Sequence, residues 1–361
     1  MPDTLLTKTK KYNYFIGIDV SRNELDYAIM HDKKLLFHRE AKNEPGDIDA
    51  FILELKALPK FTVSKSVFCM EHTGLYCNHL LNSLKKVKAN VVVENALQIK
   101  NSHGLIRGKY DKIDAIRIAQ YAEKNRDDLR LWIPRRPVLI KLAFLFSLRN
   151  RMLALQGALK TPLQEQVTFV KKGIQKENAL LCNNSIKAIK SDLTEIDLKI
   201  DEVVSSDEHL NKLMTIITSV PHVGRITAIE IITSTNEFRD INNPKKFACY
   251  AGVAPFIKES GLFKGRARVS KIANKKMKSL LHLCAMGALR YDSELKDYYI
   301  RKTQVEGKPK MAVINAIRNK IILRVFACVN QDRLFKKEYT SSNELQKVNY
   351  EGTEVEVLKK V

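Results

Sequence analysis

The chain has 361 residues, 45% of them hydrophobic and 28% charged, which is the composition of a soluble globular protein large enough for two domains. No apolar run approaches the roughly 18 residues that span a bilayer, and the N-terminus lacks the apolar core of a signal peptide. We therefore expect a cytoplasmic protein, associated with the nucleoid when bound to DNA, and no membrane partner.

The charge balance favours a polyanionic partner. The chain carries 62 Lys and Arg against 40 Asp and Glu, a net charge of +22, and nucleic acid is the commonest ligand for such a surplus. A solvated basic face or an anionic membrane would fit the charge alone. The 6 cysteines show no CxxC pair or Cys/His ligand spacing, which argues against structural zinc and a disulfide framework.

The first part of the chain reads as an α/β domain. Three short strands are predicted at 12–20, 25–31 and 34–40. They are followed by a helix near 47–57, a strand at 66–71, a helix near 75–87, a strand at 90–94 and a helix from about 112 to 125. Three strands followed by alternating helices and strands is the order of a ribonuclease H-like domain.

Four carboxylates stand where strands end or a helix begins. Asp19 follows an apolar strand, Glu71 closes another, and Asp111 and Asp114 open a helix with a spacing that puts both on one face. Each alone could be a turn or helix cap. Acids gathered from separate segments repel one another unless a cation lies among them, so together they predict a site for a hard divalent metal.

The segment from about 138 to 206 is predicted to be helical. It contains apolar residues spaced as a heptad seam of under three heptads, at Ile186, Ile189, Leu193, Ile196, Ile200 and Val203. This seam indicates a short coiled coil, in which case the protein self-associates. An intramolecular amphipathic helix is nearly as well supported, because coiled coils usually run for roughly three to four heptads.

The last region contains a turn and a basic stretch. Apolar stretches flank residues 220–224, the pattern of a helix-hairpin-helix element, whose exposed backbone N–H groups can hold a DNA phosphate. A turn between two buried helices would look alike. Downstream, basic residues crowd around one acid, Glu259, and a further helix is predicted at 311–326.

Several segments match the motifs of one family. They are GIDVS around Asp19, MEHTGLY around Glu71, KYDKIDA around Asp111 and Asp114, SVPHVG at the hairpin, and FACYAGVAPFIKESG with RVSKIANKKMKSLL. In order and spacing the chain resembles, over nearly its full length, the DEDD transposases of bacterial insertion sequences related to the Piv pilin-gene-inverting recombinase. It departs from their pattern in two places. Tyr110 replaces a frequent small polar residue, and Ile272-Ala273-Asn274 lacks a glycine before the Asn.

The resemblance implies a RuvC-like N-terminal domain whose Asp19, Glu71, Asp111 and Asp114 hold Mg²⁺, with Mn²⁺ also acceptable. The expected fold is α/β plus α. The expected domains are a RuvC-like domain at 12–150, a helical coiled-coil connector at 151–208, a mainly helical C-terminal transposase domain with the helix-hairpin-helix element at 209–335, and a tail at 336–361.

The resemblance also implies a serine nucleophile, which by position is Ser260, followed by Gly261. A serine hydroxyl is weakly acidic and needs a nearby base and polarised phosphate to attack. From the residues alone, a serine before glycine is more often an ordinary turn residue, and Ser270 is a close competitor. The predicted active site is composite, with acids from one domain and the serine from the other.

The predicted function is that of a DNA transposase or site-specific recombinase that mobilises an insertion sequence through a phosphoserine–DNA intermediate. The resemblance further implies an element-encoded guide RNA and a homo-oligomer, a dimer or tetramer. A Mg²⁺-dependent junction-resolving nuclease that uses water is the main alternative. A non-catalytic nucleic-acid-binding protein or an actin-like ATPase is a third, and the latter is disfavoured because no second glycine-rich phosphate loop follows.

Nucleic-acid contacts are predicted at basic residues near Asp111 and in the last region, and at the glycine of the hairpin. They are Arg107, Lys109, Gly224, Lys264, Arg266, Arg268, Lys271 and Lys275.

Overall fold

The structure is a computed structural model and describes residues 12–103, 111–257, 259–261, 263–265, 267–270 and 272–337, with the side chains of Phe263 and Lys264 left out. The chain divides into two compact units, Met1–Pro134 and Arg135–Val361. The predicted connector at 151–208 therefore falls inside the second unit. No helix among the described residues is both long and apolar enough to cross a membrane.

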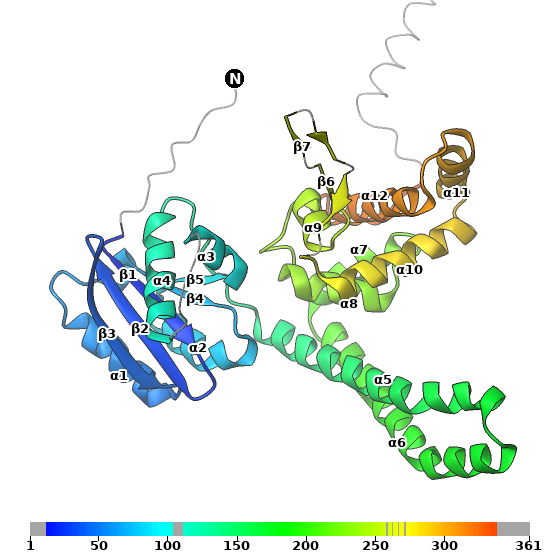
Figure 1. Cartoon of the computed structure of the whole chain (residues 1–361), viewed down its shortest axis with the longest axis horizontal. Helices are drawn as coiled ribbons and strands as arrows, with labels where there is room; N and C mark the ends of the chain where they lie inside the picture. The colour runs from blue at the N-terminus through cyan, green and yellow to red at the C-terminus, as the bar shows by residue number, and fades with distance from the viewer. Residues whose placement is uncertain are drawn as a thin grey trace, which may run out of the picture. The chain divides into compact units, whose positions relative to one another are not determined.

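The first unit is built on a mixed five-stranded sheet (Figure 1). Its strands are β1 (Tyr14–Val20), β2 (Glu24–His31), β3 (Lys34–Lys42), β4 (Ser66–Glu71) and β5 (Asn90–Glu94), in the spatial order β3-β2-β1-β4-β5. The first three strands form an antiparallel meander, and β4 and β5 run parallel to β1. The predicted strands are confirmed, and the sheet has the strand order expected of a ribonuclease H-like domain.

Helices cover both faces of this sheet (Figure 1). They are α1 (Pro45–Lys56), α2 (Asn78–Lys86), α3 (Ala96–Ser102) and α4 (Asp111–Lys124), with short 3-10 turns at Val63–Lys65 and Gly74–Cys77. Residues of α1 and α2 share one buried cluster with Ile16 and Ile18, whereas residues of α4 share another with Phe15 and Cys69. The sequence did not predict α3, which Asn95 caps by accepting a hydrogen bond from the Leu97 N–H at 2.9 Å.

Gly17 permits α4 to lie directly on β1. A Cβ atom at this position would come within 2.2 Å of the Ala115 carbonyl oxygen and the Ala119 backbone nitrogen. Backbone atoms cannot turn away as a side chain does, so any larger residue would push the helix off the sheet. The close approach of α4 to the middle of the sheet therefore depends on the absence of a side chain at position 17.

The second unit is mainly helical. Its helices are α5 (Pro137–Phe169), α6 (Lys172–Ser205), α7 (Glu208–Ser219), α8 (Arg225–Thr235), α9 (Pro244–Tyr250), α10 (Lys275–Tyr291), α11 (Ser293–Ile300) and α12 (Lys310–Asn330), with a π-helical turn at Arg301–Val305. Four two-residue strands lie between α9 and α10: β6 (Pro255–Phe256) pairs with β9 (Arg268–Val269), and β7 (Glu259–Ser260) pairs with β8 (Phe263–Lys264).

The predicted helical region is two long helices, α5 and α6, that form a hairpin (Figure 1). The seam residues Ile196, Ile200 and Val203 are buried in the same cluster as α5 residues of this chain, and Leu193 is also buried. Their burial is explained within one chain, as the amphipathic-helix alternative expects. A coiled coil with a second copy is not needed to account for them.

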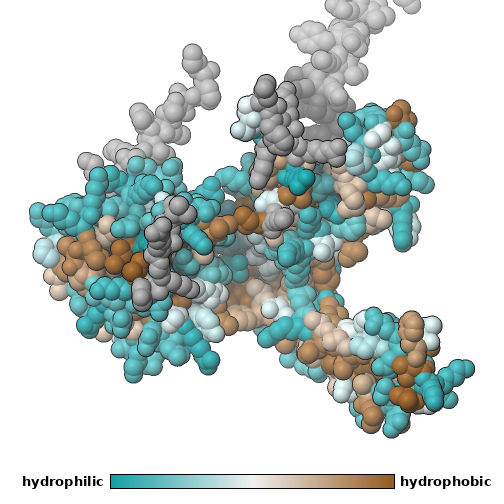
Figure 2. Space-filling model, viewed as in Figure 1, coloured by the Kyte–Doolittle hydropathy of each residue, from teal (hydrophilic) through white to brown (hydrophobic). Residues whose placement is uncertain are grey.

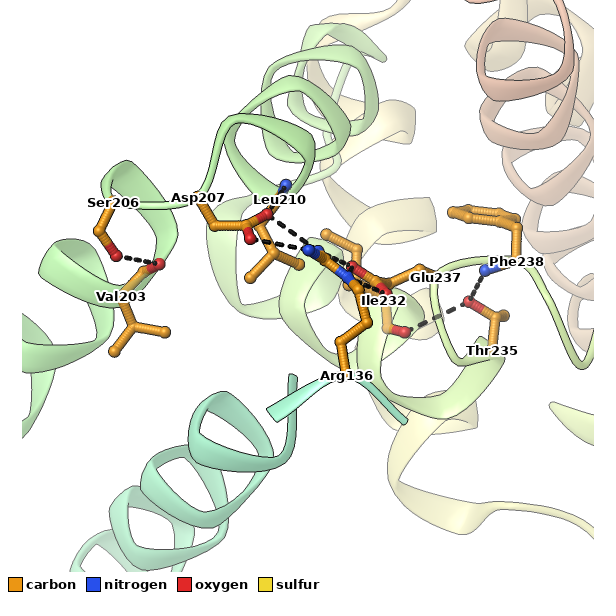
Figure 3. A network of polar contacts seen from close by, with 9 residues as sticks. All are labelled: Arg136, Val203, Ser206, Asp207, Leu210, Ile232, Thr235, Glu237 and Phe238. Atoms are coloured by element: carbon orange, nitrogen blue, oxygen red, sulfur yellow. Dashed lines mark hydrogen bonds and ion pairs between the residues drawn. The ribbon is translucent and has the colours of Figure 1, made fainter. Parts of the chain in front are cut away.

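Arg136, at the N-terminal end of α5, joins two other segments (Figure 3). Its guanidinium donates to both carboxylate oxygens of Asp207, at 2.8 and 2.9 Å, and to Glu237, whose side chain is 1% exposed. These hydrogen bonds lower the pKa of Asp207 to about 2. Glu237 lies in a turn, 236–238, whose three residues all have φ between 51° and 63°, a region that costs a non-glycine residue about 1 kcal/mol or more. The Arg136 contacts hold that strained turn in place.

We predict that Gly17→Ala destabilises the first unit by about 3 kcal/mol or more, the upper end of overpacking effects, because the clash is with backbone. Chemical denaturation followed by circular dichroism measures this. The matched control is Gly157→Ala, which lies exposed within α5 with no atom within 4 Å of the added methyl and should gain about 0.5–1 kcal/mol. Equal responses of the two variants would show that Gly17 is not a contact point.

Candidate active site

A row of carboxylates crosses the α4 face of the sheet. Side chains alternate along a strand, so Asp19 lies on the same face as Gly17, toward α4. Asp19 is directly opposite Asp26, which in turn is opposite Glu40. The row therefore continues from β1 to the edge strand β3.

The parallel strands extend the row in the other direction. Ile18 pairs with Met70, which places Glu71 at the level of Asp19, and Glu71 pairs with Glu94. In spatial order from β3 to β5, the row reads Glu40, Asp26, Asp19, Glu71 and Glu94. One carboxylate thus comes from every strand of the sheet, and all lie on one face.

The N-terminus of α4 adds two more acids. Asp111 is exposed and Asp114 half-buried in the first turn of that helix. Burial, followed by the negative charges of Asp111, Asp114, Glu71 and Asp26, raises the pKa of Asp19 to about 6. The structure therefore brings the four predicted acids into electrostatic contact around Asp19.

Several of these acids have neutral or cationic partners. Asp114 accepts from the Arg117 guanidinium at 2.8 Å. Glu94 accepts from the Tyr121 hydroxyl at 3.0 Å and from the Asn95 N–H at 2.9 Å. These contacts orient the acids at the borders of the group, while Asp19 remains the acid on which the negative charges converge.

The donor set suits a hard divalent cation. Carboxylate oxygens are the protein ligands that Mg²⁺ prefers, and like charges directly opposite each other in a sheet are destabilising without compensation. Burial and then the neighbouring negative charges raise the pKa of Asp19, and a divalent ion would offset that electrostatic cost. The chemistry of these donors therefore suits the metal predicted from the sequence, while no three of the ligand atoms of Asp19, Glu71, Asp111 and Asp114 lie within 4.8 Å of one another.

Sequence reasoning missed Asp26, Glu40 and Glu94. A signal for Asp26 was available, because Asp19 and Asp26 are equally distant from the turn between β1 and β2, and a hairpin places such residues opposite each other. Glu94 was hidden because it closes a strand whose pairing with β4 is set by tertiary contacts. Pairing registers, rather than motifs, locate these acids.

Ser260 is exposed on β7, which pairs with β8. It pairs with Phe263, and the turn between them begins at Gly261, whose φ of +55° lies in the left-handed region that favours glycine. Within the described part of the chain the Ser260 hydroxyl has no hydrogen-bond partner. The competing Ser270 is half-buried, and its hydroxyl accepts from the Ile272 N–H at 3.1 Å, so it already stabilises a local turn.

The predicted nucleic-acid contacts are only partly described. Arg107, Lys109, Arg266 and Lys271 lie outside the described residues, and so does the side chain of Lys264. Arg268 is exposed on β9, and Lys275 is exposed as the first residue of α10. Gly224 is exposed at the N-cap of α8, after a turn that joins α7 to α8.

Part of the basic stretch has a structural role. Lys276 forms a 2.5 Å ion pair with Glu230, whose residue is 8% exposed, and its ammonium lies 4.0 Å from the centre of the Phe146 ring. Ala273, where the family often has a glycine, lies against Gly252, and a Cβ added at Gly252 would come within 2.6 Å of the Ala273 Cβ.

We predict that Asp19→Asn stabilises the metal-free protein at pH 7. The fold raises the pKa of Asp19 from 3.8 to about 6. The free energy of unfolding of the wild type therefore falls as the pH rises from about 4 to 6 and Asp19 becomes ionised. At pH 7 the free energy of unfolding of the variant should be higher than that of the wild type by roughly 1 kcal/mol, a value reduced because solvent screens the half-exposed Asp19. At pH 4 the two free energies should be equal.

Denaturant unfolding in a chelator from pH 4 to 8 measures this difference. Adding Mg²⁺ should reverse the order at pH 7, because only the wild type keeps the full ligand set. A variant that is less stable than the wild type at pH 7 without metal would contradict the assignment of repulsion to Asp19.

Comparisons with known proteins point to one family. A model described as "Transposase", of the DEDD IS110 type, matches residues 16–171, and the model "Transposase IS116/IS110/IS902 family" matches residues 214–300. The chain is similar to the pilin gene-inverting protein of Moraxella bovis and to that of Moraxella lacunata. Each is 26% identical over 329 residues that cover 90% of this chain and 98% of the relative.

A solved structure of Thermus thermophilus RuvC is similar over 33% of this chain and 99% of that chain, with 15% identity and a TM-score of 0.25. At that score the likeness carries no argument, and the fold assignment rests on the sheet itself. The two family models span most of the first unit and the centre of the second, in the predicted order. The chain therefore belongs to the IS116/IS110/IS902 family of DEDD transposases.

Proposed function

We propose that this chain mobilises an insertion sequence by cutting and rejoining DNA, with four acids that hold Mg²⁺ and a serine nucleophile. Family membership makes the chain a DNA-transposing or DNA-recombining enzyme. The observation that carries the proposed chemistry is the row of carboxylates beneath the N-terminus of α4, in a chain of net charge +22. The net positive charge of the chain attracts a polyanion electrostatically. The carboxylate row nevertheless concentrates negative charge beneath α4, as a metal-dependent phosphoryl-transfer site requires.

Asp19, Glu71, Asp111 and Asp114 would hold the ion. When bound, a divalent ion supplies Lewis-acid stabilisation of negative charge on phosphoryl oxygens. The protein's own contribution is to fix these acids at the ends of β1, β4 and the start of α4, where Gly17 sets the approach of the helix. Arg117 holds the Asp114 carboxylate in orientation through its 2.8 Å contact.

Ser260 would attack the scissile phosphate. Its Oγ forms a bond to phosphorus, its proton passes to a base, and the bond from phosphorus to the leaving deoxyribose oxygen breaks as that oxygen takes up a proton. The support for Ser260 is its exposure on β7 and a hydroxyl without a partner in the described residues. The Ser270 hydroxyl, by contrast, accepts a hydrogen bond from the Ile272 N–H.

DNA is the proposed substrate. The exposed basic residues Arg268 and Lys275 and the exposed backbone at Gly224 supply phosphate contacts in the second unit. The relatives from Moraxella are named for inverting a pilin gene, a reaction that also cuts and rejoins DNA. This shared chemistry supports recombination rather than simple hydrolysis.

A structured guide RNA and a second copy of the chain are the partners in the same proposal. The proposal of a guide RNA is supported by the family resemblance alone. Self-association has a candidate surface at the tip of the α5–α6 hairpin, where Phe169 is 89% exposed and Leu180 and Leu181 are 73% and 74% exposed. Figure 2 shows this apolar surface in brown at the far end of the hairpin. A second copy of the chain would cover it.

The nucleophile is tested with labelled duplex DNA that carries the ends of the mobile element next to the gene. With Mg²⁺, the wild type should give a protein–DNA adduct that survives denaturing electrophoresis. Ser260→Ala should reduce the adduct at least about a thousandfold, because the covalent step loses its nucleophile. The matched control Ser270→Ala should retain it. Asp19→Asn should lose cleavage and adduct while still binding DNA.

Each outcome separates the functions. An adduct from Ser260→Ala would exclude Ser260 as the nucleophile. Strand cleavage by the wild type without any adduct would favour the junction-resolving nuclease that uses water. Cleavage by Asp19→Asn at the wild-type rate would contradict the metal site.

A further inference from the structure

A compact group of potential ligands lies next to the four acids, on the edge of the same sheet. It consists of Asp26, His38 and Glu40, whose ligand atoms all lie within 4.8 Å of one another. None of the three was predicted as a site residue from the sequence. The described part of the chain holds no other group of His, Cys, Asp and Glu side chains that meets this spacing.

The pairing of β2 with β3 builds this group. Asp26 is directly opposite Glu40, and Ala28 is opposite His38. His38 and Glu40 are two residues apart on one strand, so they project from the same face. The side chains of His38 and Asp26 are only 11% and 12% exposed, whereas Glu40 is exposed. Packing therefore restrains the His38 and Asp26 side chains, and Glu40 is the member of the group that solvent reaches.

Charge in this group is not balanced by protein cations. Asp26 and Glu40 are like charges in a directly opposed cross-strand pair, which is destabilising. Among the described residues, no Lys or Arg forms an ion pair with either. The His38 Nε2–H donates to Asp26 at 2.8 Å, and a protonated imidazole could balance one of the two charges. A divalent ion would balance both.

We propose that Asp26, His38 and Glu40 bind a divalent transition ion of the Mn²⁺, Co²⁺ or Zn²⁺ class. Two carboxylates and one imidazole form a mixed oxygen and nitrogen donor set, which these ions accept and which Mg²⁺ and Ca²⁺ do not favour. A coordinating nitrogen cannot also donate a hydrogen bond, so binding through Nε2 requires the His38 tautomer with its proton on Nδ1. The hydrogen bond to Asp26 is then exchanged for the ion.

The proposed site is distinct from the four-acid site but adjoins it. Asp19 and Asp26 are a directly opposed pair, and the Cβ atoms of such pairs are about 5 Å apart. The inference rests on β2 and β3 alone and does not require the proposed function. It adds a second ion, of different chemical preference, to the flank of the predicted magnesium site.

The test uses the full chain, stripped of metal, with Co²⁺ as the probe. Co²⁺ bound by imidazole and carboxylates absorbs in the visible region, and equilibrium dialysis gives the number of ions bound. The wild type should bind an ion whose addition shifts the His38 ring resonances in nitrogen–proton correlation spectra. Glu40→Gln and His38→Ala should each weaken that ion at least about tenfold.

Two controls make the result specific. His79→Ala removes an exposed histidine of α2 and should leave binding unchanged. Asp19→Asn disables the predicted magnesium site and should retain the Co²⁺ that shifts His38, so failure of the proposed function would not be mistaken for failure of this site. Glu40 is exposed, so Glu40→Gln keeps the test valid if His38→Ala does not fold. Unchanged Co²⁺ binding in Glu40→Gln, with His38 resonances unaffected by the ion, would overturn the proposal and leave a hydrogen-bonded histidine–aspartate pair only.

Discussion

Repulsion among carboxylates is the constraint around which the first unit is organised. The sheet register places one acid from each strand in a single row, and Gly17 lets α4 add two more over its centre. Hydrophobic burial on both sides of the sheet must hold this arrangement together, because the acids themselves oppose it. Repulsion among these acids therefore destabilises the first unit around Asp19, which is common at sites where a bound ligand removes the repulsion.

The second unit is held by a different kind of contact. Arg136 satisfies the nearly inaccessible carboxylate of Glu237 and the N-cap residue Asp207 together, and thereby ties the beginning of α5 to α7 and to the strained turn after α8. The helical framework built in this way carries the short β7–β8 hairpin, in which Ser260 is exposed. This exposure on a helical base suits the role of nucleophile that we propose for Ser260.

Local patterns in the sequence were sufficient for much of the fold. Alternation and turn residues located all five strands of the sheet, and the four acids were recognised because each stands at the end of an element. The hairpin of α5 and α6 was not predicted, since its turn at Val170 and Lys171 contains neither proline nor glycine. The heptad seam was compatible with packing on a second copy or on a helix of the same chain, and only the structure shows that Ile196 and Ile200 share a buried cluster with α5.

Cross-strand neighbours were the part of the site that motifs could not reveal. Asp26 and Glu40 lie in strands whose sequence looks like an ordinary meander, and they become significant only when the register sets Asp26 beside Asp19 and Glu40 beside Asp26. His38 was likewise unremarkable until its imidazole was placed against Asp26 at 2.8 Å. Site prediction from single motifs misses such groups because their proximity is a property of the sheet.

Anomalous X-ray scattering from crystals grown with Mn²⁺ tests directly whether the carboxylate row binds divalent cations. We expect an anomalous peak within about 2.5 Å of an Asp19 carboxylate oxygen, and the same peak should contact a carboxylate oxygen of Glu71 or of α4. Saturating Mn²⁺ that leaves no peak at Asp19, in crystals where these acids are ordered, would contradict it.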